Sequence, residues 1–449
     1  MSRASGRRRC AAARGIAMHR QPFTLPTMAW WLLVVSGFFH LSIGLSNTFV
    51  NIFLFKVDHS FSAIAWYNLL VFISLPFTFV LAAWMSRKTS TAMALRIGII
   101  LHAVFYAVTL MVGEQAAHVP ELLGLLTGVA EGFYWLAFDV LSIEYTDKKG
   151  HEPFFGIFGV LTSVANVVAP PVAGLLISRE DAFFGGLTGY HVVFGISFVL
   201  FIAATLLSFR LHSQALPNLR LLSGFRALQR RPWRRILIAS SLYGIREGVF
   251  MFLIGLLVYV ATGSEMKLGE FLLLQGALSF AAFFFAGRFS GRFRWRLLVS
   301  GAIGMACAAC LFLLPIRPWT IILYGCVTSA TLPFFLVPLQ GYVYDAMDDI
   351  AGHDVPSTTH IVVREWFENA GRIVGTILFI AICRHSSPQA VRGLSILSFG
   401  LGLVQLATVA LVWQVERRVF RRRSGTFAAS LGEDEQSESL AKRRARPTS

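Results

Sequence analysis

The sequence predicts an all-α integral membrane protein whose twelve transmembrane helices form two pseudo-symmetric bundles of six. Of its 449 residues, 55% are hydrophobic and only 14% are charged, whereas a typical soluble domain is roughly 25% charged. Apolar stretches of about 20 residues, enough helix to cross a hydrocarbon core of roughly 30 Å, recur twelve times. These stretches cover residues 28–55, 62–85, 95–113, 119–144, 153–178, 189–210, 236–262, 268–287, 296–315, 318–345, 360–383 and 389–415.

The distribution of basic residues predicts the orientation of the chain. If the N-terminus is cytoplasmic, the segments on that side contain 31 of the 40 Lys and Arg residues and the outer loops contain six, while three more arginines lie within spans. By the positive-inside rule, this bias predicts that both termini are cytoplasmic. We therefore expect a multi-pass protein of the plasma membrane, of the bacterial inner-membrane kind. The formal charge of +16 follows from this topology, so no nucleic-acid partner is expected.

A long basic segment divides the chain into two halves of six spans. The halves share a weak internal similarity, because with a shift of 204 residues HLSIG at 40–44 aligns with GIREG at 244–248. Such a duplication is typical of membrane proteins in which two bundles rock about a site at the membrane midplane. The predicted parts are a basic cytoplasmic tail (1–27), a first bundle (28–211), a basic cytoplasmic linker (212–235), a second bundle (236–416) and a disordered cytoplasmic tail (417–449).

The sequence predicts neither a metal site nor a bound cofactor. Its five cysteines form no even disulfide framework, and most of them lie inside apolar spans. Cys307 and Cys310 form a C-x-x-C pair within GMACAACLFLL, where small residues of an apolar helix are expected to pack rather than to bind metal. No ATP-binding loop of the form G-x-x-x-x-G-K-[ST] occurs. Any solute movement should therefore draw on an ion gradient or on the gradient of the solute itself.

Charged residues open the eleventh span, in the segment REWFENAGRIVG. An unpaired charge at the centre of a membrane helix costs about 2.5–3.5 kcal/mol, so these side chains should not face lipid. Arg364, Glu368 and Arg372 are spaced i, i+4 and i+8, which places alternating charges on one helix face. In one interpretation they form a buried bracket to a neighbouring helix. In the other, Glu368 and Arg372 line a hydrated cavity and meet a substrate or a proton, with Arg364, Glu365 and Asn369 as further cavity candidates.

The fourth span contains a polar and aromatic stripe. Glu131, Trp135 and Asp139 have the same i, i+4, i+8 spacing, so they share one side of the helix. Glu131 lies near mid-depth, and an intramembrane carboxylate is a candidate proton carrier. The alternative is a structural role, in which Arg246 or Arg372 holds Glu131 ionised. Trp135 is a further cavity candidate, because its ring is suited to stack on a substrate, and core packing is the default interpretation for the aromatic residues of this span.

The seventh and first spans add further candidates at mid-depth. Arg246 and Glu247 lie about ten residues from the cytoplasmic end of span seven, which is about 15 Å of helix. Adjacent residues of a helix point about 100° apart, so we expect one of the two to face the cavity. We expect that residue to be Arg246, as a counter-ion to Glu131 or to an anionic substrate. His40 and Asn47 on span one are cavity candidates, although a lone membrane histidine often serves only in packing.

Two further motifs carry a family resemblance. The loop after the second span reads AWMSRKTSTAMALR, and the fifth span places small residues and one proline at fixed spacings, namely Gly156, Ala165, Ala169, Pro170, Ala173 and Gly174. With the twelve spans and the basic midpoint, these features resemble the major facilitator superfamily. The loop keeps Arg87 and Lys88 of the family's G-x-x-x-D-R-x-G-R-R but lacks its glycines and aspartate. The fifth span resembles the antiporter signature G-x8-G-x3-G-P-x2-G-G with alanine at three glycine positions, and ordinary close helix packing is the alternative interpretation.

The fourth span departs from the family's R-x-x-Q-G motif. Glu131 and Gly132 occupy the Q-G place, and Gly128 stands where the family has arginine. A coupling mechanism based on that arginine is therefore not expected here.

The resemblance implies the major facilitator fold and a secondary active transporter of small solutes, of the drug or solute exporter type. We expect proton-coupled export by alternating access, with protons or another coupling ion, in a monomer whose site is formed by spans one, four, seven and eleven. One alternative is a sensor or scaffold that keeps the transporter shape without transporting. The other is a membrane-embedded enzyme, for which no H-E-x-x-H or G-x-S-x-G motif is present. Substrate, direction and coupling ion remain open at this level.

Overall fold

The computed structural model describes residues 25–146, 151–184, 187–215, 221–315, 317–349, 356–383 and 388–417. Residues 1–24 of the predicted N-terminal tail and residues 418–449 of the predicted C-terminal tail lie outside this range. Within the described residues the chain is helical and contains no strand. The predicted all-α membrane fold is therefore confirmed.

Among the residues that the structure describes, the first half of the chain contains six long helices and the second half contains five. Those of the first half are α2 (Thr27–Asp58), α3 (Phe61–Lys88), α4 (Thr91–Val112), α5 (Pro120–Glu144), α6 (His151–Phe184) and α7 (Thr188–Ser208). Those of the second half are α9 (Arg231–Thr262), α10 (Glu265–Ala309), α11 (Pro318–Asp349), α12 (Ser357–Cys383) and α13 (Pro388–Val415). Among the described residues, eleven helical segments are long and apolar enough to cross a membrane.

Helix α10 contains two of the predicted spans. Its 45 residues would form a rod of about 68 Å if they were straight, more than twice the thickness of a hydrocarbon core. The backbone leaves helical geometry at Phe293, with φ −126° and ψ 25°. Phe271 before this point packs at Gly325 of α11, and Phe312 after it packs against Tyr324 of α11 in a tilted arrangement, with ring centroids 4.6 Å apart. The chain therefore reverses at Phe293, and the twelve spans are confirmed.

Local sequence signals set several helix ends. The hydroxyl of Ser90 accepts a hydrogen bond from the backbone N–H of Met93 at the start of α4. Ser264 caps α10 in the same way through Lys267. Serine is a preferred N-cap because its oxygen satisfies a backbone donor that has no partner inside the helix. At the end of α9, Gly263 adopts φ +62°, the left-handed conformation that glycine adopts without a steric penalty.

Two G-x-x-x-G pairs allow α9 and α12 to pack closely. Gly244 and Gly248 of α9 face the backbone of α12, and Gly371 and Gly375 of α12 face the backbone of α9. A Cβ on Gly248 would lie 2.5 Å from the carbonyl oxygen of Arg372, and Cβ atoms on the other three glycines would overlap atoms of the facing helix. Small residues at this spacing permit close approach of membrane helices. The contact fixes the rotation of α9, and therefore decides which of its charged residues reaches the interior.

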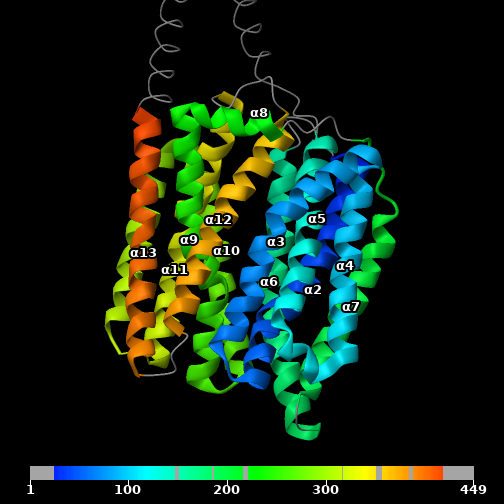
Figure 1. Ribbon diagram of the computed structural model, residues 1–449, viewed down its shortest axis with the longest axis vertical. Coiled ribbons are helices and arrows are strands. Elements are labelled where there is room, and N and C mark those ends of the chain that lie inside the picture. Colours follow the sequence, from blue (N-terminus) through cyan, green and yellow to red (C-terminus); the bar gives the residue numbers. More distant parts are fainter. Residues whose placement is uncertain are drawn as a thin grey trace, which may run out of the picture.

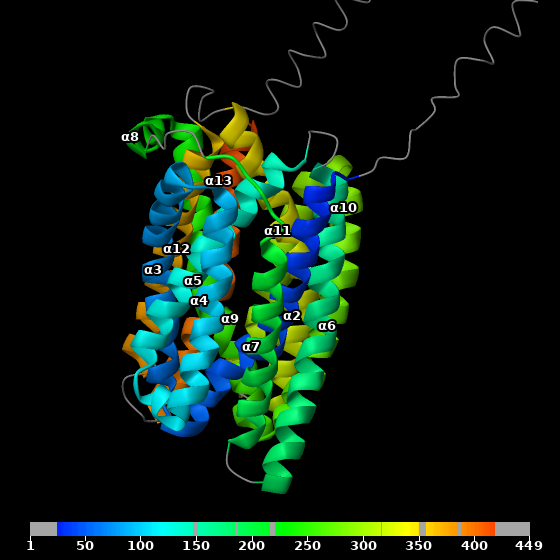
Figure 2. The same cartoon turned by 90° about the vertical axis from the view of Figure 1, so that its right-hand side faces the viewer.

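The two halves stand side by side, as Figure 1 shows, with α2 to α7 in one group and α9 to α13 in the other. Figure 2 shows that the long helices run along the long axis, and that the short helix α8 (Leu221–Arg226) lies at one end. We call this end the linker face and the opposite end the far end. α5 also ends at the linker face, where the hydroxyl of Tyr145 donates to the carbonyl of His212 at 2.8 Å. α9 begins at Arg231, inside the predicted linker.

On the side formed by α6 and α10, the halves touch at the far end and separate toward the linker face, whereas on the side of α3 and α12 the ring of Phe77 contacts that of Trp366, with centroids 4.9 Å apart. Near the far end, the ammonium of Lys56 lies 3.1 Å from a carboxylate oxygen of Glu265, which joins α2 to α10. In the far half of the α6 and α10 pair, a Cβ on Gly174 would lie 2.5 Å from the Glu265 carbonyl oxygen. Closer to the linker face, Cβ atoms on Gly159 of α6 and Gly287 of α10 would meet no described atom within 4 Å. The gap between α6 and α10 therefore opens at the linker face.

Candidate functional site

Six helices from both halves enclose a cavity of about 420 Å³, which we call the charged cavity. Its lining comes from α2, α3 and α5 of the first half and from α9, α11 and α12 of the second. Most of the charged residues singled out in the sequence line it. The charged residues that line it are Glu131, Asp139, Glu247, Arg364, Glu365, Glu368 and Arg372. With all of these ionised, the described lining has five carboxylates and two guanidinium groups and carries an excess of negative charge.

Arg372 holds two carboxylates at once. Its Nη2 lies 2.7 Å from Glu247 of α9 and 2.7 Å from Glu368 of α12. Its Nη1 donates to the side-chain oxygen of Asn369 at 3.1 Å. The guanidinium also lies over the ring of Phe72 on α3, with 5.8 Å between Cζ and the ring centroid. Arg372 therefore brackets a neighbouring helix and also lines the cavity, while its contact with a substrate or a proton stays a prediction.

Arg364 organises the other end of the same helix face. Its Nη2 bonds to Glu365 at 2.5 Å, and its Nε lies 3.8 Å from Glu368. Its Nη1 donates to the side-chain oxygen of Gln340 on α11 at 3.2 Å. The alternating charges of α12 neutralise one another in the way the i, i+4 spacing predicts. Gln340 was not among the predicted site residues, although a glutamine inside an apolar span is a signal that could have identified it.

Asn369 lies behind this network. It is fully buried and does not line the charged cavity. Its amide nitrogen donates to the backbone carbonyl of Glu365 at 2.9 Å and to the carboxylate of the same residue at 3.2 Å. Its side-chain oxygen accepts from Arg372. The amide therefore positions the ion pairs of α12, whereas the sequence placed it in the cavity.

Glu131 and Asp139 on α5 differ from the other acids of the cavity. Both line it, together with Trp135 between them, so the predicted stripe does face the interior. In the described part of the chain neither carboxylate makes a hydrogen bond or an ion pair. Each is within electrostatic range of an arginine across the cavity, Glu131 of Arg372 and Asp139 of Arg364. They are the carboxylates of this lining that no guanidinium holds by direct contact.

His40 and Asn47 of α2 line the charged cavity as predicted. The Nδ1 atom of His40 lies 2.8 Å from the carbonyl oxygen of Ser36. A carbonyl oxygen only accepts, so Nδ1 carries the proton and Nε2 is the acceptor of the ring. Trp135 packs edge-on against this imidazole, with ring centroids 5.7 Å apart.

Arg246 does not face the charged cavity, contrary to our expectation. Its side chain is buried, donates to the hydroxyl of Tyr324 at 3.3 Å and lies over the ring of Phe250. Its neighbour Glu247 lines the cavity instead. The cause is the packing of α9, because the face that carries Gly244 rests on α12. A residue two positions later points about 200° away from that face. The prediction that Arg246 is the counter-ion of Glu131 is therefore wrong.

The described residues contain no group of three or more His, Cys, Asp or Glu side chains arranged to hold a metal ion. The chemistry of the charged cavity is that of ion pairs, hydrogen bonds and exchangeable protons. Such a lining suits reversible binding of a charged solute.

Comparison with known sequences decides the family. The family model of the Major Facilitator Superfamily matches residues 32–375, which is more than half of the chain.

This chain belongs to the Major Facilitator Superfamily. It is 37% identical to YqgE of Bacillus subtilis (strain 168) over 376 residues, which is 83% of this chain and 86% of that protein. It is 43% identical over 163 residues to a protein of Geobacillus stearothermophilus encoded in the sodM 3' region, which covers 36% of this chain and 74% of that protein.

Solved structures of superfamily-type transporters share the fold. The nucleoside transporter NupG matches with a TM-score of 0.64 at 14% identity, over 86% of this chain and 99% of NupG. A structure from work on proton-dependent oligopeptide transporters matches with a TM-score of 0.63 at 13% identity, over 88% and 99% of the two chains. A bacterial homologue of the lysosomal transporter Spinster, crystallised inward-facing and unoccupied, matches with a TM-score of 0.61 at 14% identity, over 89% and 99%.

Membership of the Major Facilitator Superfamily makes this chain a multi-pass membrane transporter of small molecules rather than an enzyme. The predicted family and fold are confirmed. The family assignment leaves direction, coupling ion and substrate to be argued from the cavity itself.

The small residues of the fifth span have a packing role in this superfamily member. Ala165 and Ala169 of α6 face Gly44 of α2, where a Cβ would lie 3.1 Å from that of Ala169. Pro170 faces Gly269 of α10, and Gly174 meets the start of the same helix. Ala173 on the same stretch is fully buried. The packing of Gly156 lies outside what the structure describes. The packing interpretation of this motif therefore holds for the described contacts, and an export role remains a prediction.

Proposed function

We propose that this chain is a proton-coupled secondary transporter that exports a small solute by alternating access. The observation that carries the proposal is the contrast between two sets of carboxylates in one cavity. Glu247, Glu365 and Glu368 are each in contact with an arginine, whereas Glu131 and Asp139 make no ion pair or hydrogen bond with the described residues. A carboxylate without a direct partner is able to exchange a proton or bind a cation in each transport cycle.

The position of Glu131 supports the same role. An ionisable side chain at membrane depth is costly unless it faces a water-filled space, and Glu131 lines the charged cavity. Arg372 of the other half lies across the cavity within electrostatic range of Glu131. Protonation of Glu131 would therefore remove an attraction between the two halves. Binding and release of one proton at this site would therefore affect how the two halves attract each other.

We further propose that the linker face is cytoplasmic, so that the gap between α6 and α10 opens toward the cytoplasm. The bias of Lys and Arg toward one side supports this orientation. Contacts between α2 and α10 and between α6 and α10 close the far end, while α6 and α10 diverge toward the linker face. The Spinster homologue of similar fold was crystallised inward-facing. Export would begin from this state by solute binding from the cytoplasm.

Flux through proteoliposomes tests the proposal. A thermal-shift screen of the purified protein selects a solute, because a ligand of the folded state raises its apparent stability. Flux of that solute is then measured with and without a pH gradient. We expect the pH gradient to accelerate flux in the wild type. In Glu131→Gln this acceleration should be at least about tenfold smaller, as expected where one acid is essential. Exchange of labelled for unlabelled solute should continue in the variant.

Glu121→Gln is the matched control, because Glu121 lies exposed in the first turn of the same helix. It should leave both flux and its pH dependence unchanged. Two results would contradict proton coupling through this residue. They are wild-type flux that is the same with and without the pH gradient, and flux of Glu131→Gln that the gradient accelerates as much as in the wild type. Ligand binding without any saturable flux would contradict transport itself and favour a sensor.

A further inference from the structure

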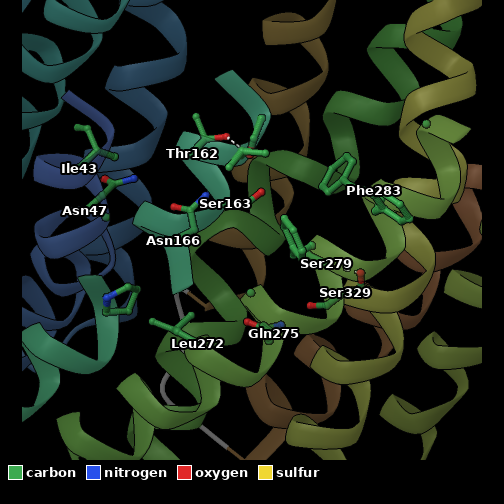
Figure 3. A pocket seen from close by; sticks show the side chains of 18 of the residues that line it. Ile43, Asn47, Thr162, Ser163, Asn166, Leu272, Gln275, Ser279, Phe283 and Ser329 are labelled. Atoms are coloured by element: carbon green, nitrogen blue, oxygen red, sulfur yellow. Dashed lines mark hydrogen bonds between the residues drawn. The ribbon is translucent and has the colours of Figure 1, made fainter. Parts of the chain in front are cut away.

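A second cavity of about 900 Å³ lies beside the charged cavity, between α2 and α6 of one half and α10 and α11 of the other. Figure 3 shows it from close by, with Asn47 and Asn166 on one side and Gln275 and Ser329 on the other. Ser163 also lines it. Among the described residues, none of those that line this cavity is charged. We call it the amide cavity.

Thr162 and Ser279 of the amide cavity donate to backbone carbonyls, but several other polar side chains of its lining have no partner among the described residues. The structure gives no hydrogen bond within the described chain to the side chains of Asn47, Ser163, Asn166, Gln275 or Ser329. Ser329 is only 7% exposed, whereas Asn47, Ser163 and Gln275 are half-buried and Asn166 is exposed. Polar groups that line an accessible cavity bond to water where no protein group is in reach. Five such groups on four helices therefore form a polar lining on which the hydrogen-bonding groups of a ligand can replace water.

The two cavities share a boundary. Asn47 and Ile43 of α2 line both of them, so a ligand could extend from one into the other. The charged cavity has an excess of carboxylates over guanidinium groups, and the amide cavity has only neutral donors and acceptors. The electrostatic character of the combined space therefore changes along its length.

We propose that the two cavities together bind a solute that joins a protonated amine to a neutral, hydroxyl-rich moiety. The amine lies in the charged cavity among the carboxylates, and the hydroxyl groups lie in the amide cavity. The assignment of this solute as the transported substrate rests on the proposed function.

The chemistry of the lining selects this class. Asn, Gln and Ser side chains each offer both a donor and an acceptor, and a hydroxyl group also acts as both, so polyols match this lining. Phe280 and Phe283 lie beside the amides and offer apolar rings to the C–H faces of such a moiety. An anionic solute would find no cation in the amide cavity and an excess of carboxylates in the other. Anionic compounds are therefore disfavoured at both ends.

Four matched probes test the inference in nanodiscs that contain the full chain. Glucosamine carries both features, glucose has only the hydroxyl groups, cyclohexylamine has only the amine, and glucuronate carries the wrong charge. Isothermal titration should rank glucosamine first, with at least about tenfold weaker binding of glucose and cyclohexylamine, which is about 1.4 kcal/mol. Glucuronate should not bind measurably.

A substitution in the amide cavity tests the bipartite arrangement. Gln275→Leu removes one hydrogen-bonding group of the amide cavity. It should therefore weaken the binding of glucosamine and leave the binding of cyclohexylamine unchanged. Gln405→Leu is the control, because Gln405 is a buried glutamine that lines neither cavity. Equal binding of glucose or glucuronate, no binding of any probe, or an unchanged preference in Gln275→Leu would overturn the inference.

The outcomes separate this inference from the proposed function. Gradient-driven flux of a solute of another class, without the expected ranking of probes, would overturn the bipartite site and leave the proposed function intact. The expected ranking without any flux would retain the site and contradict the proposed function.

Discussion

Replacing Arg372 by methionine should destabilise the folded protein by about 3 kcal/mol, because the change leaves two acids unpaired at membrane depth. Its Nη2 lies 2.7 Å from Glu247 and 2.7 Å from Glu368. The side chains of Arg372, Glu247 and Glu368 are 14%, 22% and 7% exposed. Methionine keeps much of the apolar stem of arginine. The loss of stability therefore measures the contribution of the guanidinium charge and its hydrogen bonds.

The burial of these groups sets the magnitude. Breaking a buried pair by removing one partner costs roughly 3–5 kcal/mol, whereas an exposed pair is worth about 0–1 kcal/mol. Arg372 belongs to the buried class. Because the groups line a cavity that admits water, we expect the lower end of that range. A loss of about 3 kcal/mol lowers the folding equilibrium constant by roughly a hundredfold.

Unfolding in mixed micelles, with SDS titrated into a mild detergent, measures this loss. Adding Glu247→Gln and Glu368→Gln to Arg372→Met should restore most of the stability, because the unpaired charges are then removed, and the cycle isolates the coupling. Arg246→Met is the matched control. That arginine has no ion pair in the described chain and donates one long hydrogen bond to Tyr324 at 3.3 Å, so its loss should cost about 1.5 kcal/mol, the lower end for a bond that involves a charged group. Equal effects of the two arginine substitutions would refute the argument.

Two further substitutions probe the packing of the halves. A Cβ on Gly371 would collide with the carbonyl oxygen of Ser241, so Gly371→Ala should cost about 1–3 kcal/mol of stability in the same micelle assay. Gly195→Ala, where no described atom lies within 4 Å of the added Cβ, should cost nothing, and similar losses in both would count against the packing argument. Lys56→Met removes the ion pair with Glu265 at the far end, so spin-label distances between the halves should show a larger far-end-open population. Because such a partly exposed pair is worth about 0–1 kcal/mol, that shift should be at most about fivefold, and an unchanged distribution would exclude the pair as a latch.

Hydropathy alone was enough to place the spans. An apolar run of about 20 residues crosses a bilayer as an α-helix, because the helix satisfies its own backbone hydrogen bonds. The helical period was enough to place Glu131 and Asp139 on one face and to align the charges of α12, since residues four apart always share a side. These predictions depend on local geometry. They needed no knowledge of which helices are neighbours.

The rotation of α9 could not be obtained from local geometry, and there the prediction failed. The choice between Arg246 and Glu247 depends on which face of α9 meets α12. The sequence did contain a signal, because Gly244 and Gly248 form a G-x-x-x-G pair that marks a close helix contact. With that face against α12, Arg246 necessarily points away from it. The amide cavity was missed for another reason, since Asn166 and Gln275 are unremarkable polar residues until the fold brings α6 and α10 together.

The division of charge between the two halves gives a physical basis for coupling. Both guanidinium groups of the charged cavity are on α12 of the second half, and both carboxylates without direct partners are on α5 of the first half. If the linker face closes, α5 and α12 approach, and Glu131 and Asp139 move toward Arg372 and Arg364. An ionised pair of acids would then favour closure, while a proton on either acid would weaken its attraction to the arginines. We infer that the charge of these two acids affects how readily the linker face closes, which would connect the proposed proton coupling to conformation through one electrostatic interaction.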